Sequence, residues 1–331
     1  MLRYFVQRFI FMIVTLLLVS VIIFIVIELP PGDYADRYAY RKLASTGQTV
    51  TESDMRALRH QFGLDKPPVL RYFKWISDIV LHGDFGDSFL YNVPVRNVVG
   101  ARIWLTMAMA LTAIVLTYAL AIPIGIFSAL YRHSFGDYLA TFIGYIGLSL
   151  PNFMLALVLL YFSVTVLGSS AGGLFSEEFK EAAWNWAKFV DLVKHLWVPA
   201  VVLGTANTAF HLQTMRATML DELNKLYVDA ARARGIPEWK VILKYPVRIA
   251  LNPIISYLGF DLGKLVAGAP VVALVLSLPD AGQLLLEALL QQDMFLGGAI
   301  LLMISAMIVV GVFISDLMLA ALDPRIRLGE T

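Results

Sequence analysis

The chain has 331 residues, of which 59% are hydrophobic and only 15% are charged. In soluble domains about a quarter of the residues are charged, so this composition indicates an integral membrane protein. The formal net charge of +1 does not suggest nucleic-acid binding, and the absence of cysteine excludes a disulfide framework, a thiolate nucleophile and a zinc–thiolate site.

The first predicted element is a membrane-spanning helix over residues 9–27. This run carries no charged residue, and about 20 apolar residues are enough to cross the hydrocarbon core of a bilayer. The run is longer than the apolar region of a cleaved signal peptide, so we expect a retained helix within residues 1–30.

A long polar segment, residues 31–100, follows the first helix and is expected to lie outside the cytoplasm. Within it, residues 70–81 place aromatic and aliphatic side chains at helical spacing, with Arg71, Lys74 and Asp78 between them. The spacing predicts an amphipathic helix. It either lies near the membrane interface and packs on the other helices, or is an ordinary surface helix.

Five further spans are predicted within a core of residues 101–331, over 103–131, 138–167, 195–215, 249–278 and 294–321. Basic residues of the short loops and termini fall on one side, which by the positive-inside rule is the cytoplasm. The predicted fold is therefore an all-α integral membrane protein. It has six transmembrane helices, cytoplasmic N- and C-termini, and an external polar segment after the first helix.

The longest polar interruption of the core is a cytoplasmic loop, residues 216–248. Acidic residues near its start and basic residues near its end suit the two ends of a helix dipole. These residues are Asp221, Glu222, Arg232 and Arg234. Gly235 and Pro237 then predict a break, followed by a second helical piece. The loop is either a solvated segment that obeys the positive-inside rule or a surface that touches a soluble partner.

One motif in this loop carries a resemblance. Residues 229–235, DAARARG, resemble the EAA-x-x-x-G motif of ABC importer permeases, with Asp229 in place of the usual glutamate. The spacing from Gly235 to Pro253 is similar to that of the oligopeptide/dipeptide branch. That branch is also resembled by four short motifs: GLDKP at 63–67, GDFGDS at 83–88, SLPNF at 149–153 and LDPR at 322–325. The resemblance covers nearly the whole chain.

The chain departs from this family at residues 272–282, VALVLSLPDAG. The family usually has a glutamate and a Trp-Pro-Gly turn there, and this chain has Ala273, Leu278 and Asp280. The departure concerns the extracellular gate and the class of substrate, whereas the architecture is unaffected.

The resemblance implies the permease subunit of a binding-protein-dependent ABC importer in a prokaryotic inner membrane. Its implied partners are the bilayer, a paralogous permease subunit, an extracytoplasmic solute-binding protein and two ATP-binding subunits that hold ATP and magnesium. No cofactor, metal or nucleic acid is expected on this chain. The implied substrate is a di- or oligopeptide, with oligosaccharides and nickel chelates as alternatives.

The resemblance also implies that a helix over 224–236 couples this chain to the ATP-hydrolysing subunits. By that analogy the coupling residues are Asn224, Tyr227, Asp229, Ala230, Ala231, Arg232, Arg234 and Gly235.

Two charged residues lie inside the fifth predicted span. Asp261 and Lys264 are roughly 18 Å into it at about 1.5 Å per residue, and their spacing places them on one helix face. Intramembrane charges are costly and normally face a cavity or pair with each other. Asp261 and Lys264 therefore either line the solute pathway or neutralise each other. Nearby, Gly259 and Gly263 permit close helix packing, within the chain or between subunits.

Enzyme signals are absent from the sequence, so a non-catalytic subunit is predicted. Residues 168–172 match G-x-S-x-G in letters, but they follow a membrane helix, whereas a nucleophile elbow needs a preceding strand. Two other classes of protein predict different features. A channel or secondary transporter that acts alone predicts inverted repeats, and a membrane-embedded hydrolase needs a nucleophile and a base within reach.

Overall fold

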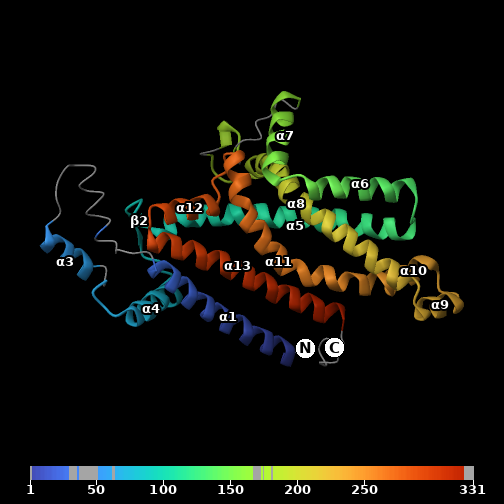
Figure 1. Cartoon of the computed structure of the whole chain (residues 1–331), viewed down its shortest axis with the longest axis horizontal. Coiled ribbons are helices and arrows are strands. Elements are labelled where there is room, and N and C mark those ends of the chain that lie inside the picture. Colours follow the sequence, from blue (N-terminus) through green and yellow to red (C-terminus); the bar gives the residue numbers. More distant parts are fainter. Residues whose placement is uncertain are drawn as a thin grey trace. The chain divides into compact units, whose positions relative to one another are not determined.

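The computed structural model describes residues 2–29, 36, 51–61, 64–166, 173, 175–179 and 182–323 (Figure 1). Most of these residues are helical. Strands β1 (Asp87–Ser88) and β2 (Val93–Pro94) pair antiparallel, with Ser88 opposite Val93. The all-α prediction is confirmed. The G-x-S-x-G match at 168–172, most of residues 31–50 and the end of the LDPR word lie outside the described residues.

The membrane-spanning helices agree with the predicted spans. Five candidates are long and apolar enough, and a bent pair of helices makes the sixth. The five are α1 (Leu2–Glu28), α5 (Val95–Leu130), α8 (Trp186–Leu223), α10 (Glu238–Lys244) together with α11 (Pro246–Val275), and α13 (Met294–Leu322). The pair is α6 (Phe135–Ser149) and α7 (Asn152–Thr165). The prediction of six spans is confirmed.

The third span is broken rather than continuous. The axes of α6 and α7 differ by 108°. Between them Leu150 has an extended backbone (φ −84°, ψ 126°), and Pro151 stands at the N-cap of α7. A residue before proline is pushed out of the helical region, because the proline ring clashes with its backbone. The SLPNF motif at residues 149–153 therefore marks a sharp bend within the membrane-spanning segment.

The residues divide into two compact units, and each is described separately. Unit 1 comprises Met1–Met12, Leu105–Gly282 and Met307–Thr331, and unit 2 comprises Ile13–Trp104 and Gln283–Ala306. In unit 1, α8 packs along both α6 and α11, and α7 contacts α8 and α11 (Figure 1). Met215 and Met219 of α8, Ala129 of α5 and Ile254 of α11 form a fully buried cluster there.

The two glycines of α11 lie where this helix packs on α13 within unit 1. A Cβ atom at Gly259 would be 2.6 Å from the Cα of Val312, whereas one at Gly263 would meet Ile308 Cδ1 at an ordinary 3.5 Å. Gly259 therefore lets two helix backbones approach closely, as small residues do in membrane proteins. The contact is within one chain.

Replacing Gly259 by alanine is expected to destabilise the protein by about 1–3 kcal/mol, because the Val312 backbone must move to admit the methyl group. Gly263→Ala is the matched control and should leave the melting temperature nearly unchanged. Thermal unfolding of the detergent-solubilised protein measures both variants. Equal melting temperatures would show that the close approach at Gly259 contributes nothing to stability.

Unit 2 contains the external segment and short helices around the end of α1. They are α3 (Glu52–Gln61), α4 (Pro68–Ser77), which continues into a π-helical turn Asp78–His82, and α12 (Ala281–Leu290), whose residues from 283 belong to this unit. The Tyr72 hydroxyl lies 2.8 Å from Ser20 Oγ, and Arg71 donates to Glu28 at 2.7 Å. The predicted helix at 70–81 is confirmed, and it packs on α1 rather than standing free.

The stretch between the fifth and sixth predicted spans, residues 279–293, contains helix α12. The sequence of α12, AGQLLLEALL, consists mainly of strong helix formers. After it, Asp293 caps α13 by accepting from the Leu296 N–H at 3.1 Å, and its other oxygen accepts from the Ser88 hydroxyl at 2.6 Å. These contacts bind the β1–β2 turn to the start of α13.

Candidate functional site

The cytoplasmic loop folds as two short helices after α8. Helix α9 (Leu226–Ala233) has eight residues and is followed by α10. The helix predicted over 224–236 is therefore shorter, since Asn224 caps the end of α8 and its amide donates to the Leu220 carbonyl at 2.9 Å. Asp221 and Glu222 belong to the last turn of α8 and not to the start of the next helix. No glycine or proline interrupts residues 216–223, so α8 continues beyond its apolar stretch.

Helix α9 ends at Gly235, as the sequence predicts. Gly235 has φ +72°, its N–H donates to the Arg232 carbonyl at 2.9 Å, and the Ile236 N–H donates to the Ala231 carbonyl at 3.4 Å. This pair of bonds is a Schellman motif, in which a left-handed residue satisfies the last carbonyls of a helix. Glycine adopts that backbone without the strain that a Cβ atom adds.

One face of α9 is buried against α10. Val228, Ala231 and Val241 are at most 4% exposed, and Tyr227, Ile236 and Tyr245 pack around them. The Tyr227 hydroxyl donates to the Glu222 carboxylate at the end of α8. Burial and this hydrogen bond raise the pKa of Tyr227 well above its ordinary value. Tyr227 and Ala231, two of the predicted coupling residues, thus hold α9 in place.

The opposite face of α9 is apolar and exposed. Leu226 is 86% exposed, and Ala230 and Ala233 follow it at positions i+4 and i+7, so the three share one stripe. Trp239 of α10 is also exposed, at 61%. Sequence reasoning selected Ala230 but missed Leu226, Ala233 and Trp239. The available signal was the second helical stripe of α9, which is offset from the buried pair Val228 and Ala231.

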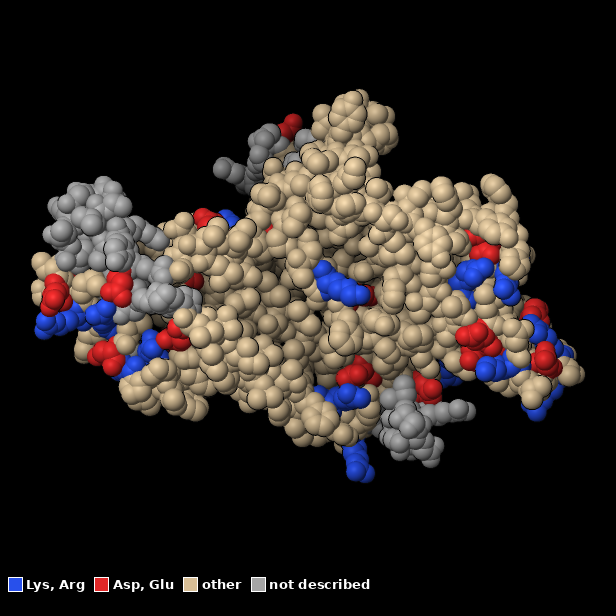
Figure 2. Space-filling model, viewed as in Figure 1, with Lys and Arg blue, Asp and Glu red and all other residues tan. Residues whose placement is uncertain are grey.

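Charged side chains gather over α9 and α10 (Figure 2). Arg232 forms ion pairs with Asp229 at 3.3 Å and with Glu238 at 2.8 Å. These partners raise the pKa of Arg232, chiefly through the hydrogen bonds that Arg232 donates to Glu238. Arg232 and Asp229 therefore stabilise the two-helix arrangement. Arg234 is exposed and, within the described part of the chain, forms no ion pair.

The helices of the loop are joined to the buried core of unit 1. Leu223 at the end of α8 and Ile242 of α10 pack on the cluster of Met215, Met219 and Ile254. The end of α8 and α10 are thus connected to α5 and α11 through close-packed side chains, and such interiors have low compressibility.

The two charged residues of α11 lie in different surroundings, although they are three residues apart. Asp261 is 1% exposed, and its Oδ2 contacts His211 Nε2 at 2.5 Å and the Tyr118 hydroxyl at 2.8 Å. Asp261 thus connects α11 to α8 and α5. Sequence reasoning missed both partners. In the Asp261–His211 pair, the second polar atom of each side chain, Asp261 Oδ1 and His211 Nδ1, has no hydrogen-bond partner among the described residues.

Lys264 lies on the exposed face of α11 and forms no ion pair with Asp261 or with any other described residue. Its ammonium group is 5.4 Å from the centre of the Phe210 ring and 5.9 Å from that of Tyr257. The exposed stripe of α11 around it carries Tyr257, Phe260, Val271 and Leu274. Lys264 is the single cation on this stripe, and two aromatic faces stabilise it.

Another intramembrane acid is paired. Asp316 of α13 forms an ion pair with Arg8 of α1 at 3.2 Å, both within unit 1. Asp137, in the first turn of α6, is also paired. Arg216 of α8 donates two hydrogen bonds to its buried carboxylate, at 2.7 and 2.8 Å. Both contacts hold helices together and have no feature of a solute site.

Comparisons with known proteins agree with this arrangement. The family model described as "Binding-protein-dependent transport system inner membrane component" matches residues 121–328, and its N-terminal counterpart matches residues 1–112. A putative peptide permease protein of Brucella ovis is 33% identical over 99% of both chains. The oligopeptide transport system permease protein AppB of Bacillus subtilis is 32% identical over 99% of this chain and 100% of its own.

The fold also has a solved counterpart. A chain of the MetNI methionine ABC transporter in an inward-facing conformation matches with a TM-score of 0.52 at 16% identity, over 68% of this chain and 96% of its own. With these similarities in sequence and fold, the chain belongs to the family of inner membrane components of binding-protein-dependent transport systems, the permease subunits of ABC importers.

Proposed function

We propose that this permease forms half of the pathway of a peptide importer and receives the force of ATP hydrolysis through α9. The observation that carries the coupling role is the apolar outer stripe of Leu226, Ala230 and Ala233 on a helix whose inner face is fixed to the core. Exposed apolar stripes rimmed by charge are typical of protein interaction sites. The partner is an ATP-binding subunit, which holds the ATP and magnesium.

The peptide substrate is inferred from the relatives, whose names include peptide and oligopeptide permeases. A glutathione transport system permease protein of Escherichia coli K12, 30% identical over 99% of both chains, is also named for a peptide-like solute. The remaining partners that we propose are a second, paralogous permease subunit and an extracytoplasmic solute-binding protein.

We place Lys264 on the solute pathway and Asp261 in the structural core. A lysine that faced lipid near the bilayer centre would be strongly unfavourable, so the exposed face of α11 must adjoin water or protein. The Lys264 ammonium can then bind the carboxylate of a passing peptide. Asp261 is enclosed by Tyr118 and His211 and has no access to that face.

Lys264→Gln is expected to reduce uptake of peptides with a free C-terminal carboxylate by about tenfold, the effect of roughly 1.4 kcal/mol of lost charge–charge interaction. Removing an intramembrane charge should not lower the melting temperature. Arg56→Gln, an exposed change on α3, is the control. Equal uptake by Lys264→Gln and wild type, or equal loss for C-terminally amidated peptides, contradicts a carboxylate contact.

The test of the proposed function is reconstitution in liposomes of the complete complex, with the ATP-binding subunits and the solute-binding protein encoded beside this chain. ATP-dependent uptake of labelled di- and oligopeptides is expected. Uptake of an oligosaccharide or a nickel chelate in place of peptides would overturn the proposed substrate. Uptake by this chain alone would overturn the coupled mechanism.

A further inference from the structure

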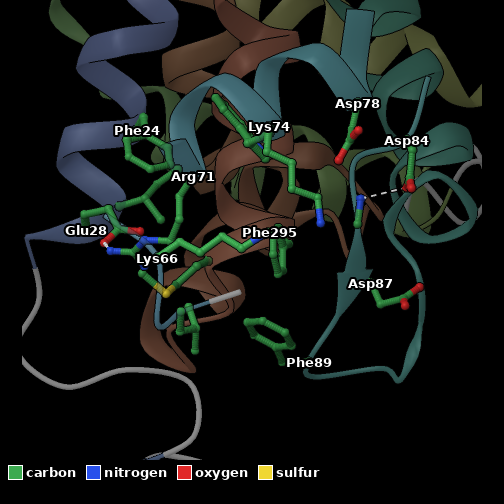
Figure 3. A pocket seen from close by; sticks show the side chains of 15 residues that line it. Phe24, Glu28, Lys66, Arg71, Lys74, Asp78, Asp84, Asp87, Phe89 and Phe295 are labelled. Atoms are coloured by element: carbon green, nitrogen blue, oxygen red, sulfur yellow. Dashed lines mark hydrogen bonds and ion pairs between the residues drawn. The ribbon is translucent and has the colours of Figure 1, made fainter. Parts of the chain in front are cut away.

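Unit 2 contains a cavity of about 340 Å³ at the external end of the first membrane helix (Figure 3). Its walls come from the end of α1, from α4, from the turn before β1 and from the start of α13. The size suits a small organic molecule, since pockets for such ligands measure about 300–1,000 Å³. The transport roles of α9 and α11 do not use this cavity.

The lining of this cavity separates charges of opposite sign. Lys66, Arg71 and Glu28 lie on one side, and Asp78, Asp84 and Asp87 on the other, while Lys74 extends into the space between them (Figure 3). The Arg71–Glu28 ion pair, at 2.7 Å, neutralises two of these charges. One side of the cavity therefore keeps a cationic character and the other an anionic character.

Several charged groups facing the cavity are uncommitted, whereas the Asp78 carboxylate lies 3.9 Å from His82 Nδ1. Within the described ranges, Lys66, Lys74 and Asp87 form no ion pair, and the Nε of Arg71 is buried without a hydrogen-bond partner. Asp84 accepts a hydrogen bond from the Gly86 N–H at 2.9 Å. Charged donors and acceptors held on opposite walls can bind a ligand that carries both signs, through charge-assisted hydrogen bonds.

Aromatic side chains complete the cavity between the charged walls. Phe24, Trp75, Phe89 and Phe295 line it, and Phe89 and Phe295 contact edge to face at 5.1 Å. Trp75 and Phe89 are at most 9% exposed, so this apolar surface is fixed in place. This surface can bury the apolar part of a ligand, because removal of apolar area from water is favourable and aromatic rings supply much of that area.

We propose that this cavity binds a small zwitterion with an apolar body, its anionic group at Lys66 and Lys74 and its ammonium group at Asp78 and Asp87. A short peptide with free termini has this chemistry, so the inference rests on the peptide specificity proposed above. The cavity then holds peptide at the outer end of α1, separately from the pathway at Lys264. The headgroup of phosphatidylethanolamine shares the same pair of charges and is the other possible source.

Equilibrium binding of radiolabelled dileucine to the permease pair in nanodiscs, without the solute-binding protein, tests the proposal. Saturable binding is expected, with loss of binding for N-acetyl-dileucine and for dileucine amide, since each lacks one charge. Lys74→Gln and Asp87→Asn, both exposed changes, should each weaken binding by tenfold or more. Arg56→Gln on α3 lies in the same unit outside the cavity and should bind like wild type.

The nanodisc lipid separates the two sources. Binding of dileucine that is equal in phosphatidylglycerol and phosphatidylethanolamine discs assigns the cavity to peptide. If phosphatidylethanolamine discs bind less dileucine than phosphatidylglycerol discs, and Lys74→Gln and Asp87→Asn each abolish that difference, the same charge pair binds the lipid headgroup. Absence of saturable binding in either lipid, or binding that neither the variants nor the blocked peptides weaken, overturns the proposal.

ATP-driven uptake of dileucine by the complete complex is measured in parallel. Uptake without binding at the cavity overturns this inference and leaves the proposed function standing, whereas failure to take up any peptide overturns the proposed function itself.

Discussion

Replacing Leu226 or Ala230 by glutamate is expected to abolish ATP-driven uptake while the chain still folds and inserts. Leu226 is 86% exposed and Ala230 also faces solvent, so a carboxylate at either position is tolerated in the free chain. Against an ATP-binding subunit it would be buried without a partner, which costs about 2–5 kcal/mol. Binding of that subunit should weaken by roughly 30-fold or more, at about 1.4 kcal/mol per tenfold.

Copurification of the ATP-binding subunit with the tagged permease and uptake in liposomes measure this effect. Val80→Glu is the matched control, because Val80 is a similarly exposed apolar residue, 71% exposed, in the external segment. If the α9 variants copurify with the ATP-binding subunit and transport as well as Val80→Glu does, the outer stripe of α9 is not the docking surface.

Replacing Asp261 by alanine is expected to produce the largest loss of stability in the chain. The side chain joins α11 to His211 of α8 and Tyr118 of α5. His211 would lose its hydrogen-bond partner, whereas the Tyr118 hydroxyl would keep the Ile254 carbonyl, at 3.2 Å, as an acceptor. Removing one member of a buried charged pair costs about 3–5 kcal/mol, because the remaining polar groups stay buried and unpaired. A thermal or SDS unfolding titration of the purified protein measures the change.

Two further variants separate loss of pairing from loss of volume. Asp261→Asn keeps one acceptor oxygen and should lose clearly less stability than Asp261→Ala. The double variant Asp261→Leu with His211→Leu removes both polar groups together and should recover part of the loss, since an apolar replacement leaves fewer groups unpaired. Equal stability of Asp261→Ala and wild type would show that the contact does not hold the helices together.

Much of the fold follows from sequence, because membrane helices leave strong local signals. Long uncharged runs mark the spans, and Gly235 marks the end of α9, since a left-handed cap strongly favours glycine. Pro151 likewise explains the broken third span once its effect on Leu150 is considered. These features depend on neighbouring residues alone.

The buried polar network could not be predicted in the same way. Asp261 is 50 residues from His211 and 143 from Tyr118 along the chain, so only tertiary packing brings the three together. The different surroundings of Asp261 and Lys264 could not be predicted for the same reason. Helix spacing places both residues on one side of α11, but it does not show which neighbouring helices enclose each side chain. The ion pair of Arg232 with Glu238 likewise depends on α10 lying beside α9, which the spacing of residues in the sequence does not show.

The most direct test of the coupling role uses the absence of cysteine from this chain. A single cysteine introduced as Ala230→Cys can be labelled with a benzophenone maleimide and photocrosslinked in the assembled complex. We expect a crosslink to the ATP-binding subunit whose yield changes when ATP binds, and none from Val80→Cys. Photocrosslinking of Ala230→Cys to lipid or to the other permease alone, with no product containing the ATP-binding subunit, would contradict the role assigned to α9.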